Sequence, residues 1–460
     1  MENVWKKYSD EDIQKINELS EDYRNFLSVS KIEREVVRNS IALAEQAGFM
    51  NLDRYIESNH SLEAGDRVYV NNRGKSLALF IIGKEDITKG INILGAHVDS
   101  PRLDLKANPL YEESDFAYLD THYYGGIKKY QWVTLPLALH GVIVRKNGEV
   151  IPVEIGENEN DPVIGITDLL PHLGSEQLKK EASKVIEGEG LDILIGSVPM
   201  ITDDKDEKDL VKQNVLEVLK KWFDIEEDDL LSAEIEVVPA GRARDFGLDR
   251  SMIMGYGQDD KVCAYTSLRA FLDAPVCSKT ISCILVDKEE IGSMGATGMQ
   301  STFYENAILE ICNLMGHSEN TALSRCLSNS YMLSSDVNAA YDPLYSDVMD
   351  KRNSSYFNRG VVFCKYTGSR GKSGSNDANA EFVAKLRNIM DNHQVYFQIS
   401  ELGKVDAGGG GTIAYILANK NVNVIDCGVG VLSMHAPWEV TAKSDIYEAY
   451  KCYLAFLQDA

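Results

Sequence analysis

The sequence predicts an α/β protein in which a mixed, mostly parallel sheet is flanked by helices and interrupted by an inserted β-rich domain. Two observations lead to this prediction. Short apolar runs alternate with helical stretches near both ends of the 460-residue chain, a rhythm typical of βαβ units. From about residue 104 to 245 this rhythm gives way to alternating strands and turn signals. We therefore expect one α/β domain, residues 1–103 and 246–460, with an insert at 104–245.

The first part of the predicted α/β domain combines a helical region with two strands. Apolar residues recur at three- and four-residue steps over residues 10–48, and Ser9 precedes an acidic first turn, as is typical of a helix start. The apolar runs at 77–82 and 91–95 predict strands. The second run leads directly into the segment HVDSP.

The insert and the last part of the chain supply the remaining strands. Residues 142–155 alternate around Asn147-Gly148, a strong hairpin signal, and residues 233–241 predict a returning strand. After residue 246, apolar strands are predicted at 281–287, 331–336 and 422–428. Ligands bind beyond the carboxyl ends of strands in open α/β sheets, so ionisable residues at those ends are the candidates for chemistry.

The charge balance and the cysteine pattern restrict the function. The chain has 47 Lys and Arg against 71 Asp and Glu, a net charge of −24, so we expect neither nucleic-acid nor membrane partners. The eight cysteines form no CxxC pair, which argues against a cysteine zinc site. The charged N-terminus lacks an apolar signal core, and no apolar run approaches the ~18 residues of a membrane span. We expect a cytoplasmic, reduced protein.

Five segments place ionisable side chains after an apolar run, and the first two contain a histidine and three aspartates. His97 and Asp99 would point to one face of an extended segment, where the carboxylate could orient a metal-binding imidazole. A hydrogen-bonded loop histidine is the alternative. Asp259 and Asp260 precede a helical run, where a carboxylate either caps the helix or bridges two metals.

The other three segments contribute further carboxylates and a second histidine. Glu289 and Glu290 follow a buried strand, and their mutual repulsion could be offset by a cation, the alternative being a charged loop edge. Asp336 could be a ligand or a turn residue, and His435 a ligand or a core histidine. Together these nitrogen and oxygen donors suit zinc, manganese or cobalt. A shared carboxylate would hold two such ions ~3.5–4 Å apart as a co-catalytic pair.

The five segments, in this order, resemble the aspartyl aminopeptidase and vacuolar aminopeptidase I family of dizinc metallopeptidases. The matching stretches are HVDSPRLDLK, GQDDKVCAYTS, DKEEIGSMGATGMQS, SSDV and VLSMHAPWE, and the resemblance covers nearly the whole chain. It implies a zinc-exopeptidase-like fold and an aminopeptidase that releases N-terminal residues from short peptides through a dizinc-activated water. The cofactors would be two divalent ions, Zn²⁺ by resemblance, with Co²⁺ or Mn²⁺ compatible with the same ligands.

The resemblance implies a ligand set for each metal ion. His97, Asp259 and Asp336 would hold one ion. Asp259, Glu290 and His435 would hold the other, so that Asp259 bridges the pair.

Further roles are implied for residues around the ions and for the assembly. Glu289 would be the general base, and Asp99 would orient His97. His172 would reach a neighbouring subunit's active site, and Lys365 would contact the substrate. The insert would be a dimerisation domain, and the chains would form a tetrahedral dodecamer.

The chain also departs from the acid-preferring members of that family. Those carry Asp-Asn where this chain has Asp259-Asp260, which favours the branch that accepts neutral and hydrophobic N-terminal residues. Two other functions fit the same ligands. A dizinc carboxypeptidase or amide deacylase would need a cationic clamp for a substrate carboxylate. A non-catalytic, metal-stabilised oligomeric shell would give Glu289 no task.

Overall fold

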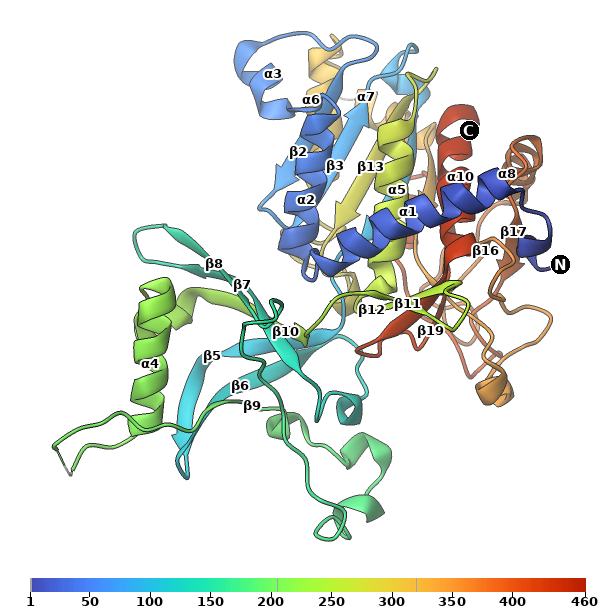
Figure 1. Cartoon of the computed structure of the whole chain (residues 1–460). Helices are drawn as coiled ribbons and strands as arrows, with labels where there is room; N and C mark the ends of the chain where they lie inside the picture. The colour runs from blue at the N-terminus through green and yellow to red at the C-terminus, as the bar shows by residue number, and fades with distance from the viewer. Residues whose placement is uncertain (1, 205, 320) are drawn as a thin grey trace. The chain divides into compact units, whose positions relative to one another are not determined.

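The structure is a computed structural model, and it describes residues 2–204, 206–319 and 321–460. Its contacts divide the chain into two compact units, which are described separately (Figure 1). The first, called the sheet unit, runs to Asp99 and resumes over Ala243–Met434 and Glu439–Ala460. The second, called the inserted unit, comprises Ser100–Arg242 and also His435–Trp438. The grouping of this short C-terminal segment with the insert is not foreseen from the sequence.

The predicted mixed, mostly parallel sheet is confirmed in the sheet unit. In the described part of the chain its order is β1-β2-β3-β13-β4-β14-β18-β16-β17. The central strands β13, β4, β14 and β18 run parallel, so their carboxyl ends share one edge. The antiparallel pairs are β2 with β3, β3 with β13, and β16 with β18. The strands are β1 (Met50–Asn51), β2 (Arg67–Asn72), β3 (Ser76–Ile81), β4 (Ile91–His97), β13 (Thr280–Val286), β14 (Tyr331–Ser334), β16 (Val361–Cys364), β17 (Phe397–Ser400) and β18 (Asn423–Gly428).

Helices cover both faces of this sheet, because its central strands are apolar on both sides. In β4, Leu94 and Ala96 pack in one core, and Ile91 and Ile93 pack in the other. Helices α1, α2, α5, α8 and α10 cover the first face, and α3, α6, α7 and α9 cover the second. Their bounds are α1 (Asp10–Ser28), α2 (Glu33–Gln46), α3 (Leu52–Ser58), α5 (Gln258–Asp273), α6 (Phe303–Leu314), α7 (Ala322–Ser328), α8 (Ala380–Asn392), α9 (Ala414–Ala418) and α10 (Lys443–Asp459).

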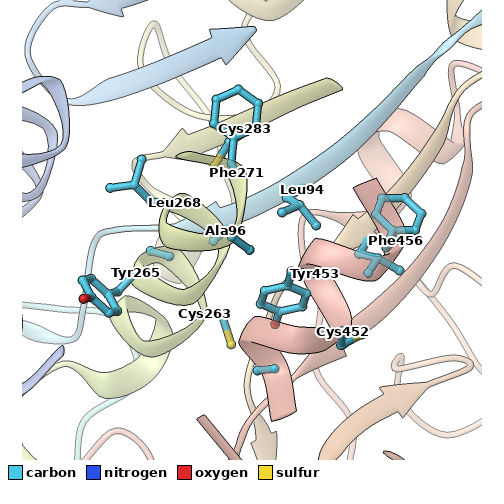
Figure 2. Packing of buried hydrophobic residues seen from close by; sticks show 14 of the residues in the cluster. Leu94, Ala96, Cys263, Tyr265, Leu268, Phe271, Cys283, Cys452, Tyr453 and Phe456 are labelled. Atoms are coloured by element: carbon cyan, nitrogen blue, oxygen red, sulfur yellow. The ribbon is translucent and has the colours of Figure 1, made fainter. Parts of the chain in front are cut away.

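Figure 2 shows the core between the sheet and two of these helices. Phe271 and Cys263 extend from α5, and Tyr453 and Phe456 extend from α10, close to Leu94 of β4. All five side chains are buried. This packing fixes the position of α5, whose first residues include two of the candidate site aspartates.

The helical region predicted over residues 10–48 is two helices rather than one. Ser9 is the N-cap of α1, as predicted, and also forms a capping box with Asp12. Helix α1 ends at Ser28, and α2 begins at Glu33. The side-chain amide of Asn39 donates to the carbonyl of Val29 at 3.0 Å, so this backbone acceptor in the turn between the helices has a partner. The turn contains neither Gly nor Pro, so the periodicity alone does not reveal it.

The inserted unit is β-rich, as predicted. In its described residues an antiparallel sheet has the order β8-β7-β10-β5-β6-β9. The hairpin predicted around Asn147-Gly148 is confirmed as β7 paired with β8. The elements are β5 (Arg102–Glu113), β6 (Phe116–Tyr124), β7 (Leu137–Val144), β8 (Val150–Ile155), β9 (Ile193–Gly196), β10 (Ala233–Pro239) and α4 (Leu210–Phe223).

A small sheet completes the sheet unit, with the order β11-β12-β20-β19-β15 in the described residues. Its strands are β11 (Arg244–Phe246), β12 (Met252–Gly255), β15 (Asn338–Ala339), β19 (Gly430–Leu432) and β20 (Glu439–Ala442). Strand β12 leads into α5 and pairs with β20, so this sheet joins the start of α5 to Glu439. Among the described helices, none combines the length and the apolar character needed to cross a bilayer.

Candidate metal centre

The candidate residues of the sheet unit follow neighbouring parallel strands. His97 is the last residue of β4, and Asp336 lies two residues beyond β14. Glu289 and Glu290 begin a 3₁₀ helix, η8 (Glu289–Ile291), shortly after β13. Because β13, β4 and β14 are parallel neighbours, these side chains meet at one edge of the sheet.

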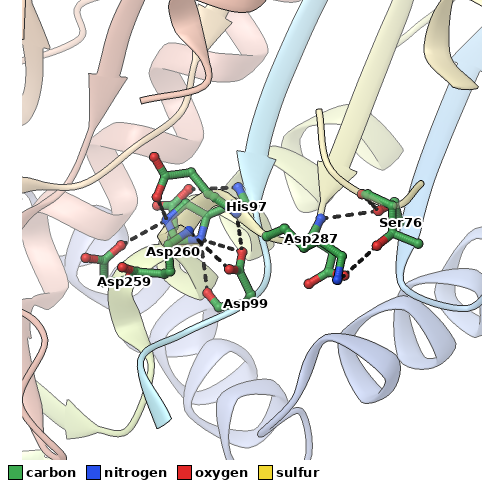
Figure 3. Close-up of polar contacts among 10 residues, drawn as sticks. Ser76, His97, Asp99, Asp259, Asp260 and Asp287 are labelled. Atoms are coloured by element: carbon green, nitrogen blue, oxygen red, sulfur yellow. Dashed lines mark hydrogen bonds and ion pairs between the residues drawn. The ribbon is translucent and has the colours of Figure 1, made fainter. Parts of the chain in front are cut away.

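His97 is the centre of the cluster, with 2% of its surface exposed (Figure 3). Its Nδ1 lies 3.0 Å from the carbonyl oxygen of Asp99 and 3.3 Å from a carboxylate oxygen of the same residue. Its Nε2 lies 3.1 Å from Asp259 Oδ1. Burial lowers the pKa of His97, but the hydrogen bonds to Asp259 and Asp99 outweigh it, and the pKa lies well above its usual value. A donating Nδ1 would leave Nε2 as the ligand atom, the arrangement found in metal-bound histidines.

Asp99 connects His97 to the loop that carries the two glutamates. Its carboxylate oxygens accept the backbone N–H groups of Glu289 at 3.1 Å and Glu290 at 3.2 Å. Asp99 is itself buried. The carboxylate therefore contacts both the imidazole and the start of η8, and its orienting role stays a prediction.

Asp287, two residues before Glu289, ties the two ends of that loop together beside the cluster (Figure 3). Its carboxylate accepts the Thr297 hydroxyl at 2.7 Å, and its backbone N–H donates to the Ser76 hydroxyl at 3.2 Å. Burial raises the pKa of Asp287 to about 6. Because both ends of the segment are held, Glu289 has a defined position without being enclosed.

Asp259 is positioned by two residues that the sequence reasoning missed. Its backbone N–H donates to Glu439 Oε2 at 3.0 Å. Gln258 is fully buried and donates through its side-chain amide to the carbonyls of Ile253 at 3.0 Å and Glu439 at 2.7 Å. The available signal is in the quoted motifs themselves, since Gln258 and Glu439 are polar residues inside GQDDK and HAPWE.

Asp260, although adjacent to Asp259, contacts the backbone of His97 rather than its ring. It is fully buried, one carboxylate oxygen accepts the His97 backbone N–H at 3.3 Å, and the other has no hydrogen-bond partner among the described residues. Burial raises its pKa well above the usual value. Burial, followed by the charge of Asp260, also raises the pKa of Asp336. The site thus concentrates negative charge in a poorly solvated place, which a bound cation would stabilise.

Two groups of ligand atoms in the sheet unit fit a divalent ion. The candidate ligand atoms of His97, Asp259 and Asp336 all lie within 4.8 Å of one another, and the same holds for His97, Glu289 and Glu290. One imidazole with several carboxylates suits zinc and similar ions. The first group is the set expected for one metal ion. The second includes the residue expected as general base.

Glu289 is partly exposed, like Asp336 and Glu290, and it lies farther from the His97 ring than Asp259 does. Its Oε2 lies 3.9 Å from His97 Nε2, outside hydrogen-bond range, and 15% of its side chain is exposed. A carboxylate beside the ligand atoms, yet reachable by solvent, can take a proton from a water molecule and release it again.

His435 lies three residues after β19, in the segment that groups with the inserted unit. Its backbone has φ +63°, and its Nδ1 lies 2.9 Å from the carbonyl oxygen of Gly126. A backbone carbonyl at Nδ1 fixes the tautomer that carries its lone pair on Nε2, which is what a metal ligand needs. Its pairing with Asp259 and Glu290 around a second ion stays a prediction.

The two remaining candidates lie outside these ligand groups. His172 is exposed in a turn of the inserted unit. Lys365 follows β16, is half-buried and lies 3.7 Å from an Asp377 carboxylate oxygen. The roles of both residues stay predictions.

Comparisons with known proteins agree with this geometry. A family model described as aminopeptidase I zinc metalloprotease (M18) matches residues 26–457. A probable M18 family aminopeptidase 1 from Clostridium acetobutylicum is 58% identical over 457 residues, which cover 99% of this chain and 98% of that protein. The crystal structure of an M18 aminopeptidase from Thermotoga maritima has a TM-score of 0.94 at 42% identity, covering 100% of this chain and 99% of that one.

A more distant structure shares the fold. The S. cerevisiae mApe1 dodecamer has a TM-score of 0.77 at 20% identity, covering 96% of this chain and 97% of that one. The family model and the close relatives extend over nearly the whole chain, including all five segments that carry the candidate ligands. The chain therefore belongs to the M18 family of aminopeptidase I zinc metalloproteases.

Proposed function

We propose that this metalloaminopeptidase removes single N-terminal residues from short peptides at a centre of two divalent ions, with zinc as the native metal. The observation that carries the proposal is the convergence of His97, Asp259 and Asp336 within 4.8 Å at the carboxyl edge of the sheet. Those residues would hold one ion, and Asp259, Glu290 and His435 would hold the other. When bound, such a pair polarises the scissile carbonyl and activates water.

Glu289 would handle the protons. Its position next to His97 Nε2, its partial exposure and its backbone bond to Asp99 support this role. Its carboxylate would accept a proton from the attacking water and pass it to the leaving amine. Asp99 would act as a positioning residue, because it contacts both His97 and the backbone of the glutamates.

The family membership disfavours the two alternative functions. A carboxypeptidase or deacylase would need a cation next to the ligands, and Lys365 instead lies beside Asp377. A non-catalytic shell would leave the partly exposed carboxylate of Glu289 without a role. For the N-terminal residue of the substrate, the Asp259-Asp260 pair favours neutral and hydrophobic side chains.

The test combines substrate specificity with metal content. The metal-loaded enzyme is assayed with Leu, Ala, Asp and Glu p-nitroanilides and with their N-acetylated forms, before and after chelation and re-addition of zinc, cobalt or manganese. We expect the enzyme to hydrolyse only the free-amine substrates and to lose this activity on chelation. Glu289→Gln should lower kcat by about 10²–10⁴-fold at unchanged metal content. Glu381→Gln, on the exposed surface of α8, is the matched control. Full activity of Glu289→Gln would refute the assignment.

The assembly and the cellular location extend the proposal. The mApe1 structure is a dodecamer, which supports an oligomer for this chain, and the tetrahedral arrangement and the dimerising role of residues 104–245 are the forms we propose. Sedimentation of the purified protein decides between a dodecamer and smaller species. The cytoplasmic location stays a prediction.

A further inference from the structure

Two lysines meet at one tyrosine ring at the amino edge of the central parallel strands, the edge opposite the candidate metal centre. Lys279 directly precedes β13, and Tyr331 is the first residue of β14. Strand β4 lies between these two strands, and its first residues, Ile91 and Asn92, pair with Thr280 and Tyr331. The register of the sheet therefore places Lys279 and Tyr331 on the two sides of the start of β4.

Helix α8 brings the second lysine to the same ring. Phe382 packs against Tyr331 with 5.1 Å between the ring centroids. Lys385 lies about one turn further along the helix, beside Phe382, because residues three apart are neighbours on a helix surface. Its ammonium nitrogen lies 4.1 Å from the centroid of the Tyr331 ring, and that of Lys279 lies 4.6 Å from it. The two nitrogens are therefore close enough for one small molecule to contact both.

No carboxylate neutralises this pair of lysines. In the described part of the chain, neither Lys279 nor Lys385 has a carboxylate within ion-pair distance. Both side chains are half-buried, and Lys279 Nζ lies 3.5 Å from the carbonyl oxygen of Asn329, at the outer limit of a hydrogen bond. Their positive charge stands out in a chain with a net charge of −24. The pair is therefore available to an anion.

The surroundings of Lys279 also favour its neutral amine. Burial, followed by the charge of Lys385, lowers the pKa of Lys279 below its ordinary value. Glu85 and Cys326 act electrostatically in the opposite direction and offset this only in part. Burial also lowers the pKa of Lys385. A lysine that is desolvated and lies next to a second cation is the kind that acts as a nucleophile.

We propose that Lys279 is a modification site that takes the acyl group of a small acyl phosphate, with the phosphate group held by Lys385. An acyl phosphate fits the pair because it combines an electrophilic carbon with an anionic leaving group. The nitrogen of Lys279 faces the first, and the charge of Lys385 attracts the second. This inference does not depend on the proposed aminopeptidase function.

The modification is an acyl transfer from oxygen to nitrogen. The neutral nitrogen of Lys279 attacks the acyl carbon, an amide bond forms, and the bond between that carbon and the phosphate oxygen breaks. The oxygen keeps the electron pair of the broken bond. The proton that the nitrogen loses passes to the departing phosphate, which leaves as hydrogen phosphate. Because the acylated lysine is neutral, the pair then carries one positive charge fewer.

The test follows the acetylation of individual lysines in the metal-loaded, full-length enzyme. The protein is incubated with acetyl phosphate at pH 8, and mass spectrometry of proteolytic peptides gives the initial rate at each lysine. Lys221 is the control for an exposed lysine, and Lys146, which is paired with Asp228 at 3.0 Å, is the control for a lysine in an ion pair. The uncharged N-hydroxysuccinimide ester of acetic acid is used in parallel, because it lacks the phosphate group.

Three variants examine the role of the second lysine. Lys385→Gln removes its charge, and Lys385→Arg keeps it. Arg387→Gln is the matched control, because it removes an exposed positive charge from the same helix. The Tm and the metal content of every protein are compared with those of the wild type.

We expect acetyl phosphate to modify Lys279 at least about five times faster than Lys221 and Lys146, because Lys385 attracts the phosphate and the neutral amine is more populated. Lys385→Gln should slow this reaction by about three- to tenfold, and should slow the reaction with the uncharged ester less. Lys385→Arg and Arg387→Gln should stay within about twofold of the wild type. Added inorganic phosphate should slow the reaction of acetyl phosphate with Lys279 more than that with Lys221.

Three results would overturn the proposal. The first is a rate at Lys279 that does not exceed the rates at Lys221 and Lys146. The second is an equal rate of Lys279 acetylation in Lys385→Gln and Arg387→Gln. The third is an equal loss with both acyl donors in Lys385→Gln, which would refute the contact with the phosphate group. The first comparison uses the wild-type protein alone, so it does not depend on the folding of a variant.

Discussion

Asp426 is a buried carboxyl group whose removal should stabilise the protein. It lies in β18, is 3% exposed, and neither of its carboxylate oxygens has a hydrogen-bond partner among the described residues. Burial raises its pKa to about 6, and the nearby hydroxyls of Ser334 and Thr412 lower it only in part. The charged form is therefore disfavoured in the folded state. Asp426→Asn replaces it with a neutral side chain of the same shape.

The size and the sign of the effect follow from this pKa. An unfolded aspartate has a pKa of about 3.9, so ionisation of Asp426 destabilises the fold as the pH rises through the range between the two values. Below that range the group is neutral in both states and has no effect. The difference corresponds to about 3 kcal/mol at pH 8 and about half of that at pH 5. Asp426→Asn should therefore raise the free energy of unfolding by about these amounts at the two pH values.

Thermal unfolding of the metal-loaded protein at fixed concentration measures the prediction. The Tm of Asp426→Asn should exceed that of the wild type by about 3–5 °C at pH 8, and by about half as much at pH 5. Asp391→Asn, at an exposed carboxyl of α8, is the control and should change the Tm much less. A Tm gain that is equal at both pH values, or a loss at pH 8, would refute the reasoning.

Three further predictions concern the candidate site. Asp99→Asn should weaken metal binding about 10–100-fold in a metal titration, because the amide orients His97 less well; unchanged affinity would contradict that role. Chelation should lower the Tm more at pH 8 than at pH 6, because burial raises the pKa of Asp336 and acidification then neutralises part of the repulsion. An equal drop in Tm at both pH values would argue against this role of the Asp336 carboxyl. His172→Phe should impair activity at unchanged metal content, and mixing it with Glu289→Gln should restore some activity if subunits exchange. No recovery despite proven exchange would contradict action across a subunit boundary.

The strands and their carboxyl ends could be predicted from the sequence because they depend on local patterns. The runs before His97 and Glu289 are apolar on both faces, as is typical of central parallel strands. Since parallel strands share one edge, the order of motifs along the chain was enough to predict that these two residues converge.

The residues that position the ligands could not be predicted in the same way, because their roles depend on contacts between distant segments. Glu439 accepts the backbone N–H of Asp259 from 180 positions away, and nothing in its own surroundings indicates that partner. The adjacent Asp259 and Asp260 look equivalent in the sequence. Only the fold shows that the first contacts the His97 ring and that the second accepts the His97 backbone N–H.

The position of Glu289 bears on whether this cluster would serve hydrolysis or storage of metal. A metal-storage site binds its ion more tightly when every carboxylate is enclosed as a ligand, since each one helps to neutralise the ion. Here Asp99 anchors the backbone of Glu289, while its carboxylate stays partly exposed and 3.9 Å from His97 Nε2. The buried carboxylate of Asp99 thus holds the backbone of Glu289, so that the Glu289 carboxylate lies close to His97. In this position the Glu289 carboxylate would be able to exchange protons with a molecule at the centre, as its proposed role requires.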